Sequence, residues 1–281
     1  MKKAALGLAI LVIRVGASAQ IQSGSVAVIT SSKEEIVIAA DSRRIAGDSY
    51  TDSACKITAL GNKLIFAAVG HTGFGPPNGP AIWNSQTLAR NEFVRLQRKQ
   101  TTHDWTLDLA RAWGNATKIK VQGLLTKYGR TFLVGLDGND ITSAAFAGFD
   151  EDGAVSLVRS VIAYQTTKQG LLATSRFDRI LIVPGEMQVL GEGEIASEIN
   201  GNTPAAAQLR QEAEADIRSG HWKDPTVFWA IEAVRLTIEH HPGKINNGRL
   251  ISSVGGPVDA VILSHPSGVH WIQRKDNCPA N

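Results

Sequence analysis

The sequence predicts an α+β protein built as a four-layer α/β/β/α sandwich, with two antiparallel sheets between outer helices. Three observations predict it. Two pairs of strand-like runs fill the stretch from Ser23 to Gly70, two helix-like segments follow, and strands, helices and closing strands complete the chain. The composition, 43% hydrophobic and 20% charged over 281 residues, suits one globular domain. We therefore expect a single domain over residues 20–281.

Residues 1–19 have the features of a signal peptide. Lys2 and Lys3 precede the apolar run Ala4–Ile13, and Ala17-Ser18-Ala19 forms a cleavage site of the A-x-A type. The run is too short to span a bilayer. We expect an exported protein, periplasmic or secreted, that does not associate with the membrane after cleavage.

The net charge of +3 comes from the expected signal peptide. Removing Lys2, Lys3 and Arg14 leaves 26 basic residues against 26 acidic ones, a net charge near zero. Such a balance gives no support to nucleic-acid binding, and no nucleic-acid partner is expected.

Two β-hairpins are expected in the N-terminal part. The first joins Val26–Ile29 to Ile36–Ala40 through a polar connector, and the second joins Cys55–Leu60 to Leu64–Val69 through a Gly61-Asn62 turn. Polar residues lie at the strand ends, where a sandwich could gather them at one rim: Ser23, Ser25, Asp41, Lys56 and Gly70.

The remaining elements follow from apolar periodicity. Helices are expected at Pro80–Gln97, His103–Lys127, Pro204–Ser219 and Pro225–His240, and strands at Thr131–Leu136, Ala144–Gly148, Ala154–Arg159, Met187–Leu190, within Val258–Leu263 and at Val269–Ile272. Ile162–Val183 is weakly patterned. His240-His241 closes a helix, where capping is favoured over a metal site because adjacent helical side chains point in different directions.

The stretch from Ser23 to Gly70 resembles the N-terminal half of a proteasome β-type subunit, an N-terminal-nucleophile (Ntn) hydrolase. In that family a hydroxyl residue opens the mature chain, a strand ends in Ala-Ala-Asp-Ser-Arg or similar, and a lysine and a glycine follow in order. Here Ala39–Arg43 matches the strand end, Lys56 lies 15 positions after Asp41, and Gly70 lies 14 after Lys56. The resemblance covers nearly all of the expected mature chain and is strongest at residues 23–70 and 252–272.

The resemblance implies a mechanism and a role for each residue. The nucleophile is a hydroxyl at the first residue, and its own α-amine is the base. An α-amine titrates near neutral pH, so a useful fraction can accept a proton. Lys56 is then the activating lysine, Asp41 its partner, and Gly70 the backbone donor to the oxyanion.

Two serines compete for the nucleophile's place. Cleavage after Ala19 leaves residues ahead of both, so a further cut is needed. Strand alignment favours Ser23, while the interval to Asp41 and the preceding Gly24 favour Ser25. If neither serine becomes the first residue, the chain resembles the family's uncleaved, noncatalytic subunits.

The sequence departs from the family pattern at two further places. Glu192 replaces a serine that assists the terminal amine. Ile251 and Val254 replace an Asp and a Ser before the late Gly-Gly, where Ser252 or Ser253 could substitute with a shift of register.

Three functions follow from these observations. They are an exported peptidase, a small-molecule amidase or acylase on the same fold, and an inactive subunit that serves in binding or assembly. The expected partner is a peptide or small amide substrate, and self-association into a homo-oligomer is implied by the family alone. No metal or organic cofactor is expected, because metalloprotease and phosphate-loop motifs are absent and Pro76-Pro77 interrupts the glycine-rich stretch after Gly70.

The two cysteines, Cys55 and Cys278, form no metal-binding pattern. Export would permit a disulfide between them, but the sequence does not show that they meet. A buried free Cys55 inside a strand is the default interpretation.

Overall fold

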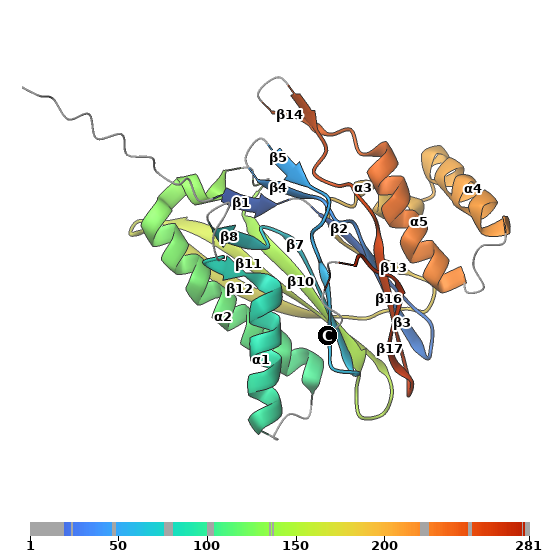
Figure 1. Cartoon of the computed structure of the whole chain (residues 1–281), viewed down its shortest axis with the longest axis horizontal. Coiled ribbons are helices and arrows are strands. Elements are labelled where there is room, and N and C mark those ends of the chain that lie inside the picture. The colour runs from blue at the N-terminus through green and yellow to red at the C-terminus, as the bar shows by residue number, and fades with distance from the viewer. Residues whose placement is uncertain are drawn as a thin grey trace, which may run out of the picture.

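The computed structural model describes residues 20–23, 25–46, 49–75, 81–99, 104–134, 136, 138–219, 225–246, 249–276 and 278. The expected signal peptide, residues 1–19, lies outside them. The described residues form five α-helices and several antiparallel sheets, so the fold is α+β and compatible with the expected sandwich (Figure 1). No helix among them is long and apolar enough to cross a membrane.

One central sheet contains the first expected hairpin. Its strand order is β13 (Met187–Gly191), β2 (Val26–Ser31), β3 (Glu35–Ala40), β16 (Asp259–Ser264) and β17 (Gly268–Gln273). The hairpin β2–β3 is confirmed, with Ile29 opposite Ile38. β3 also pairs with β16, so the polar residues after β3 meet the segment that precedes β16.

A second central sheet contains the other expected hairpin. Its order is β12 (Gly170–Ile180), β11 (Val155–Thr167), β10 (Asp140–Phe149), β7 (Leu64–Gly70) and β6 (Ile57–Leu60). The hairpin β6–β7 is confirmed, with Leu60 opposite Leu64. The two N-terminal hairpins therefore belong to different sheets.

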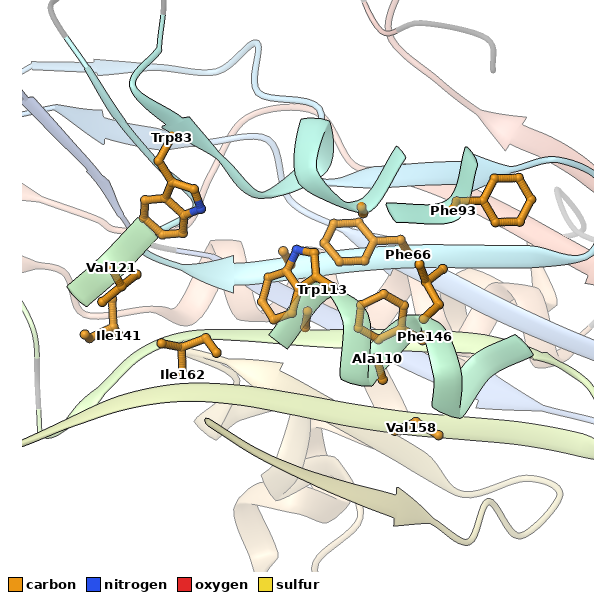
Figure 2. Packing of buried hydrophobic residues seen from close by; sticks show 14 of the residues in the cluster. Phe66, Trp83, Phe93, Ala110, Trp113, Val121, Ile141, Phe146, Val158 and Ile162 are labelled. Carbon is orange, nitrogen blue, oxygen red and sulfur yellow. The ribbon is translucent and has the colours of Figure 1, made fainter. Parts of the chain in front are cut away.

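Helices α1 (Ser85–Lys99) and α2 (Trp105–Tyr128) pack against one face of the second sheet. Asp104 caps α2, its carboxylate accepting the N–H of Leu107 at 3.0 Å. Under α2 the ring of Phe66 lies 5.7 Å from that of Trp113 and 5.1 Å from that of Phe146 (Figure 2). This aromatic cluster fixes α2 over β7 and β10.

Helices α3 (Glu194–Ile199), α4 (Pro204–Arg218) and α5 (Pro225–His240) belong to the other side of the molecule (Figure 1). Their buried residues form one cluster with Val28 and Val37 of the first sheet. Thr203 caps α4, and Pro204 begins it, as proline commonly does at a first helical position.

A third core cluster joins the two central sheets. Ile38 comes from the first sheet, Ile65 and Leu157 come from the second, and all three are buried in this cluster. Along β2, Val28 turns toward the helices and Ile29 toward the other sheet, as the two-residue period of a strand requires. Both faces of each central sheet are thus covered.

The structure also has a small sheet that the sequence analysis did not foresee. Its order is β5 (Ser49–Thr51), β4 (Arg44–Ala46), β1 (Gln20–Ser23), β8 (Gly73–Gly75) and β9 (Trp83–Asn84). β1 lies in the middle, antiparallel to β4 and to β8. A two-stranded sheet, β14 (Lys244–Asn246) with β15 (Arg249–Ile251), stands apart.

One expectation about local structure was wrong. Thr131–Leu136 is not a strand: Gly129–Leu133 is a 3-10 helix (η1) whose Phe132 enters the aromatic core. A short apolar run does not reveal its type by periodicity alone. The weakly patterned Ile162–Val183 belongs largely to the long β11–β12 hairpin, whose edge strand exposes much of its surface and therefore shows little alternation.

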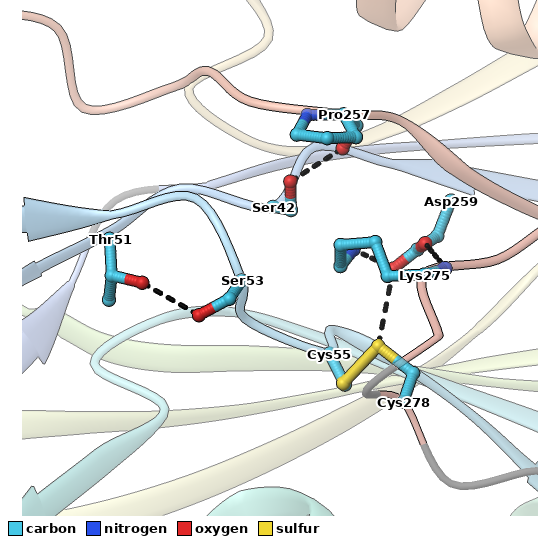
Figure 3. The surroundings of a disulfide bond; sticks show 8 residues. All are labelled: Ser42, Thr51, Ser53, Cys55, Pro257, Asp259, Lys275 and Cys278. Carbon is cyan, nitrogen blue, oxygen red and sulfur yellow. Dashed lines mark hydrogen bonds and ion pairs between the residues drawn. A yellow bond between two sulfur atoms is a disulfide. The ribbon is translucent and has the colours of Figure 1, made fainter.

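Cys55 and Cys278 form a disulfide, with 5.5 Å between their Cα atoms (Figure 3). The bond ties the C-terminal segment to the residue directly before Lys56. Asp259 and Lys275 form an ion pair beside it. The default interpretation, a buried free Cys55, is therefore wrong.

Candidate functional site

The carboxylate of Asp41 is the centre of the candidate site. Asp41 follows β3 and is fully buried. Its Oδ1 accepts the backbone N–H of Val26 at 2.9 Å, and its Oδ2 accepts those of Gly255 at 3.0 Å and Arg43 at 3.1 Å. Backbone from three segments thus fixes this carboxylate, and Gly255 belongs to the late Gly-Gly of the sequence.

Lys56 completes a buried ion pair with Asp41. Its Nζ lies 2.6 Å from Asp41 Oδ1, and the two side chains are 3% and 0% exposed. Burial lowers the pKa of Lys56, while the charge and hydrogen bond of Asp41 oppose that shift. The sequence placed these residues in one site, and the structure brings them into direct contact.

Ser25 lies next to this ion pair. It is 1% exposed, and the N–H of the following Val26 is the one bonded to Asp41. Its carbonyl oxygen accepts the N–H of Glu192 at 2.9 Å. Gly191 permits this approach, because it has φ +80° and a Cβ on it would lie 2.1 Å from the Ser25 oxygen.

Gly70 lies at the end of β7, near the same point. A Cβ on Gly191 would also lie 3.1 Å from Val69, the neighbour of Gly70, so Gly191 stands between Ser25 and the end of β7. Gly70 has φ +81°, a conformation that disfavours other residues, and a Cβ there would lie 2.8 Å from the oxygen of Ile141. The rim expected from the sequence is therefore present in part, at Ser25, Asp41, Lys56 and the end of β7.

Ser23 occupies a different place. It belongs to β1 and pairs with Ile45 of β4. Further along β1, Gln22 pairs with Gly73 of β8. Gly24 lies outside the described residues, as does the side chain of Ser23. The backbone ahead of Ser25 is therefore held as a strand between β4 and β8.

A second polar cluster lies on the other side of Ser25. Glu192 Oε2 is 3.0 Å from His241 Nε2 and also accepts a hydrogen bond from Ser253. His241 Nδ1 accepts the N–H of Gly243 at 3.1 Å and lies 3.2 Å from Ser252 Oγ. Ser253 thus contacts Glu192, as expected if Ser253 takes the place of the family's serine through a shift of register.

Sequence reasoning missed the part of His241 in this cluster. The capping interpretation of His240-His241 placed it at a helix end, but its imidazole faces Glu192 and Ser252 instead. No local pattern could have linked residues 192, 241 and 252. Val254, at one departure from the family pattern, is buried in the apolar cluster under α5.

A cavity of about 430 Å³ lies beside the Glu192–His241 cluster and the end of β7, lined among others by Gly70, His71, Arg159, Gly191, Glu192 and His241. His71 is fully buried, and neither of its ring nitrogens has a hydrogen-bond partner among the described residues. Burial lowers its pKa to about 3, so the ring is neutral at physiological pH. The cavity thus borders the expected oxyanion donor and the Glu192–His241 pair together.

The arrangement has the parts of an activated hydroxyl site. It offers a serine, a buried ammonium with its carboxylate partner, and a glycine at a strand end. Within the described ranges, no group of three or more His, Cys, Asp or Glu side chains could hold a metal ion. No protein-family model and no curated protein matches the chain.

Proposed function

We propose that this protein is an exported Ntn hydrolase, resembling proteasome β-type subunits, that cleaves amide bonds in peptides with Ser25 as nucleophile. The buried Asp41–Lys56 pair beside Ser25 is the observation that carries the proposal. Ser25 is favoured over Ser23 because its neighbour Val26 bonds directly to Asp41, while Ser23 belongs to the preceding strand.

The reaction requires a cut between Gly24 and Ser25, which frees the α-amine of Ser25. That amine takes the hydroxyl proton as Oγ attacks the amide carbonyl, and it then protonates the departing nitrogen. The resulting acyl ester is hydrolysed by water, which restores the hydroxyl. Lys56 supplies positive charge beside the nucleophile, and the N–H of Gly70 donates to the oxyanion.

β1 supports a peptide as substrate. It lies between β4 and β8 and ends directly before Gly24 and Ser25. Once it is removed, the acyl part of a peptide can add as a strand in the same groove, a common mode of peptide recognition. In the uncut chain, β1 fills that groove and blocks it.

The disulfide supports the proposed export. Cys55 and Cys278 are bonded, and such bonds persist in oxidising compartments outside the cytosol. Self-association remains a proposal that rests on the family resemblance.

The test is the N-terminus of the exported protein. We expect intact-mass measurement to give a chain that begins at Ser25. Ser25→Ala should retain the preceding residues and lose all hydrolysis of acyl-peptide amides, because the hydroxyl and its cut are gone. Ser23→Ala, the matched control, should be processed normally. A folded mature chain that begins at Gln20 would rule out the α-amine as base.

The second candidate is an inactive relative that serves in binding or assembly. The observation that favours it is β1 itself, because its pairing on both sides stabilises the uncut chain. A mature chain that begins at Gln20, with Ser25 buried and amidase activity absent, would support this candidate.

A further inference from the structure

Arg159 is a charged residue in an apolar layer. It lies on β11 opposite Ala145, and it shares a strand face with Leu157, two residues away. Ala145 and Leu157 both belong to the core between the two central sheets. The side chain of Arg159 is half-buried and lines the cavity beside Gly70. A guanidinium at such a position needs a functional or structural partner.

The described residues satisfy only part of the hydrogen-bonding capacity of Arg159. The Nε of Arg159 donates to Ser143 Oγ at 3.1 Å. Its two terminal nitrogens make no hydrogen bond, and no carboxylate forms an ion pair with it, among the residues that the structure describes. The planar fork of the guanidinium, which suits a carboxylate, is therefore unused.

The other charged groups around the cavity are accounted for. Asp140 pairs with Arg176 at 2.8 Å, and Glu192 pairs with His241 and Ser253. Glu194 is exposed to solvent at the start of α3. His71 is neutral because of its burial. Among the described residues of the second sheet that line the cavity, the charged side chain without an ion-pair partner is that of Arg159.

We propose that Arg159 binds the α-carboxylate of the leaving amino acid, so that the enzyme releases single carboxyl-terminal residues from short peptides or N-acyl amino acids. This inference rests on the proposed function and names its substrate class. The acyl part takes the place of β1 between β4 and β8. The leaving group enters the cavity on the far side of Gly70 and Gly191.

The walls of the cavity agree with this substrate. Val69, Ile141, Ile195 and Pro242 line it together with Arg159. They provide apolar contact for the side chain of a residue such as leucine. A volume of about 430 Å³ is enough for one amino-acid residue with its side chain.

The test compares two substrates that differ only at the carboxylate. Acetyl-Gln-Ser-Gly-Leu copies Gln22-Ser23-Gly24 on its acyl side and ends in a free carboxylate, and its partner ends in a carboxamide. We expect kcat/KM to be at least about tenfold higher for the free acid, as bidentate charge-assisted pairing implies. Arg159→Gln should bring the ratio to about one, and Arg159→Lys should keep part of it. Arg95→Gln, an exposed arginine on α1, is the matched control and should keep the full ratio.

A binding measurement separates this inference from the proposed function. Calorimetry with L-leucine and L-leucinamide needs no hydrolysis and can be done on uncut Ser25→Ala protein. Leucine binding that Arg159→Gln removes would support the site even if the chain is never processed. Hydrolysis of both tetrapeptides at equal rates, or equal binding of leucine and leucinamide, would overturn the inference while leaving the hydrolase proposal intact.

Discussion

Two polar pairs lie near Ser25, the ion pair of Asp41 with Lys56 and the contact of Glu192 with His241, and they differ in burial and in support. Asp41 and Lys56 are 0% and 3% exposed, and backbone N–H groups from three segments complete the carboxylate's bonds. Glu192 and His241 are 34% and 12% exposed and are held mainly by serine hydroxyls and one backbone N–H. The first pair belongs to the core of the fold, and the second belongs to the wall of a cavity.

The difference shows which pair the fold depends on. A buried charge that loses its partner is strongly destabilising, while a pair that is partly exposed to solvent contributes less. We therefore expect mutations at Asp41 or Lys56 to affect folding as well as catalysis. Mutations at Glu192 or His241 should act mainly on the site.

The largest expected effect is that of Lys56→Met. The variant leaves the buried carboxylate of Asp41 without its countercharge, so we expect a loss of about 3–5 kcal/mol in the free energy of unfolding. Urea denaturation in the Ser25→Ala background measures it on chains with the same N-terminus. Lys63→Met, an exposed lysine in the turn before β7, is the control and should change stability little. Adding Asp41→Asn to Lys56→Met should recover part of the loss, and equal effects of the two lysines would contradict the core role.

Removing the disulfide tests whether the region of the Asp41–Lys56 pair depends on a covalent link to the C-terminal segment. Cys55 precedes Lys56 directly, and the bond to Cys278 spans 223 residues. Replacing both cysteines by alanine should lower the free energy of unfolding by about 2–4 kcal/mol, because the unfolded chain gains freedom. Reduced wild-type protein should show the same loss. If the reduced and oxidised proteins unfold at the same urea concentration, the bond does not stabilise this region.

His71 lies beside Gly70 and should make stability depend on pH. Its pKa is about 3 in the fold and 6.5 in the unfolded chain, so below pH 6.5 the unfolded chain binds a proton that the folded chain does not. Stability is therefore lost as the pH falls from 6.5 toward 3, by about 2 kcal/mol between pH 6.5 and 5. His71→Phe should remove this slope, while His270→Gln, at an exposed position on β17, should keep it. Urea denaturation at both pH values is the measurement, and an unchanged slope in His71→Phe would assign the effect elsewhere.

The smallest expected effect is that of Glu192→Gln. The glutamine amide can still accept a hydrogen bond from Ser253. The negative charge that faces His241 is lost, and this pair is partly exposed to solvent. We expect at most about 1 kcal/mol of lost stability by urea denaturation. Glu212→Gln, the other glutamate that faces a histidine of this segment, is the exposed control. A loss as large as that of Lys56→Met would remove the distinction between the two pairs.

The first pair could be found from the sequence because each partner lies at the end of a strongly patterned element. Ala39-Ala40 ends β3 directly before Asp41, and Lys56 directly precedes β6. Strand ends meet at sheet rims, so the residue types and their order pointed to one site. The choice between Ser23 and Ser25 depended on pairing, which local periodicity does not reveal.

The second pair and the cavity could not be found in this way. Glu192 follows β13, His241 follows α5, and Arg159 lies within β11, far apart along the chain. The strand pattern of β11 even predicts an apolar residue at position 159. Only the pairing of β10 with both β7 and β11 brings that arginine to the same cavity as Gly70.

The sequence by itself determined the α+β class and the two hairpins, because two-residue and 3.6-residue periodicities are local properties of the chain. The partnership of Asp41 with Lys56 came from the resemblance of the ordered motifs to a known family. The tertiary structure decided the place of β1 between β4 and β8, the disulfide, and the Glu192–His241 contact, which lines the same cavity as Arg159. These depend on which distant segments become neighbours, and that is set by the joint burial of apolar surfaces rather than by any one segment.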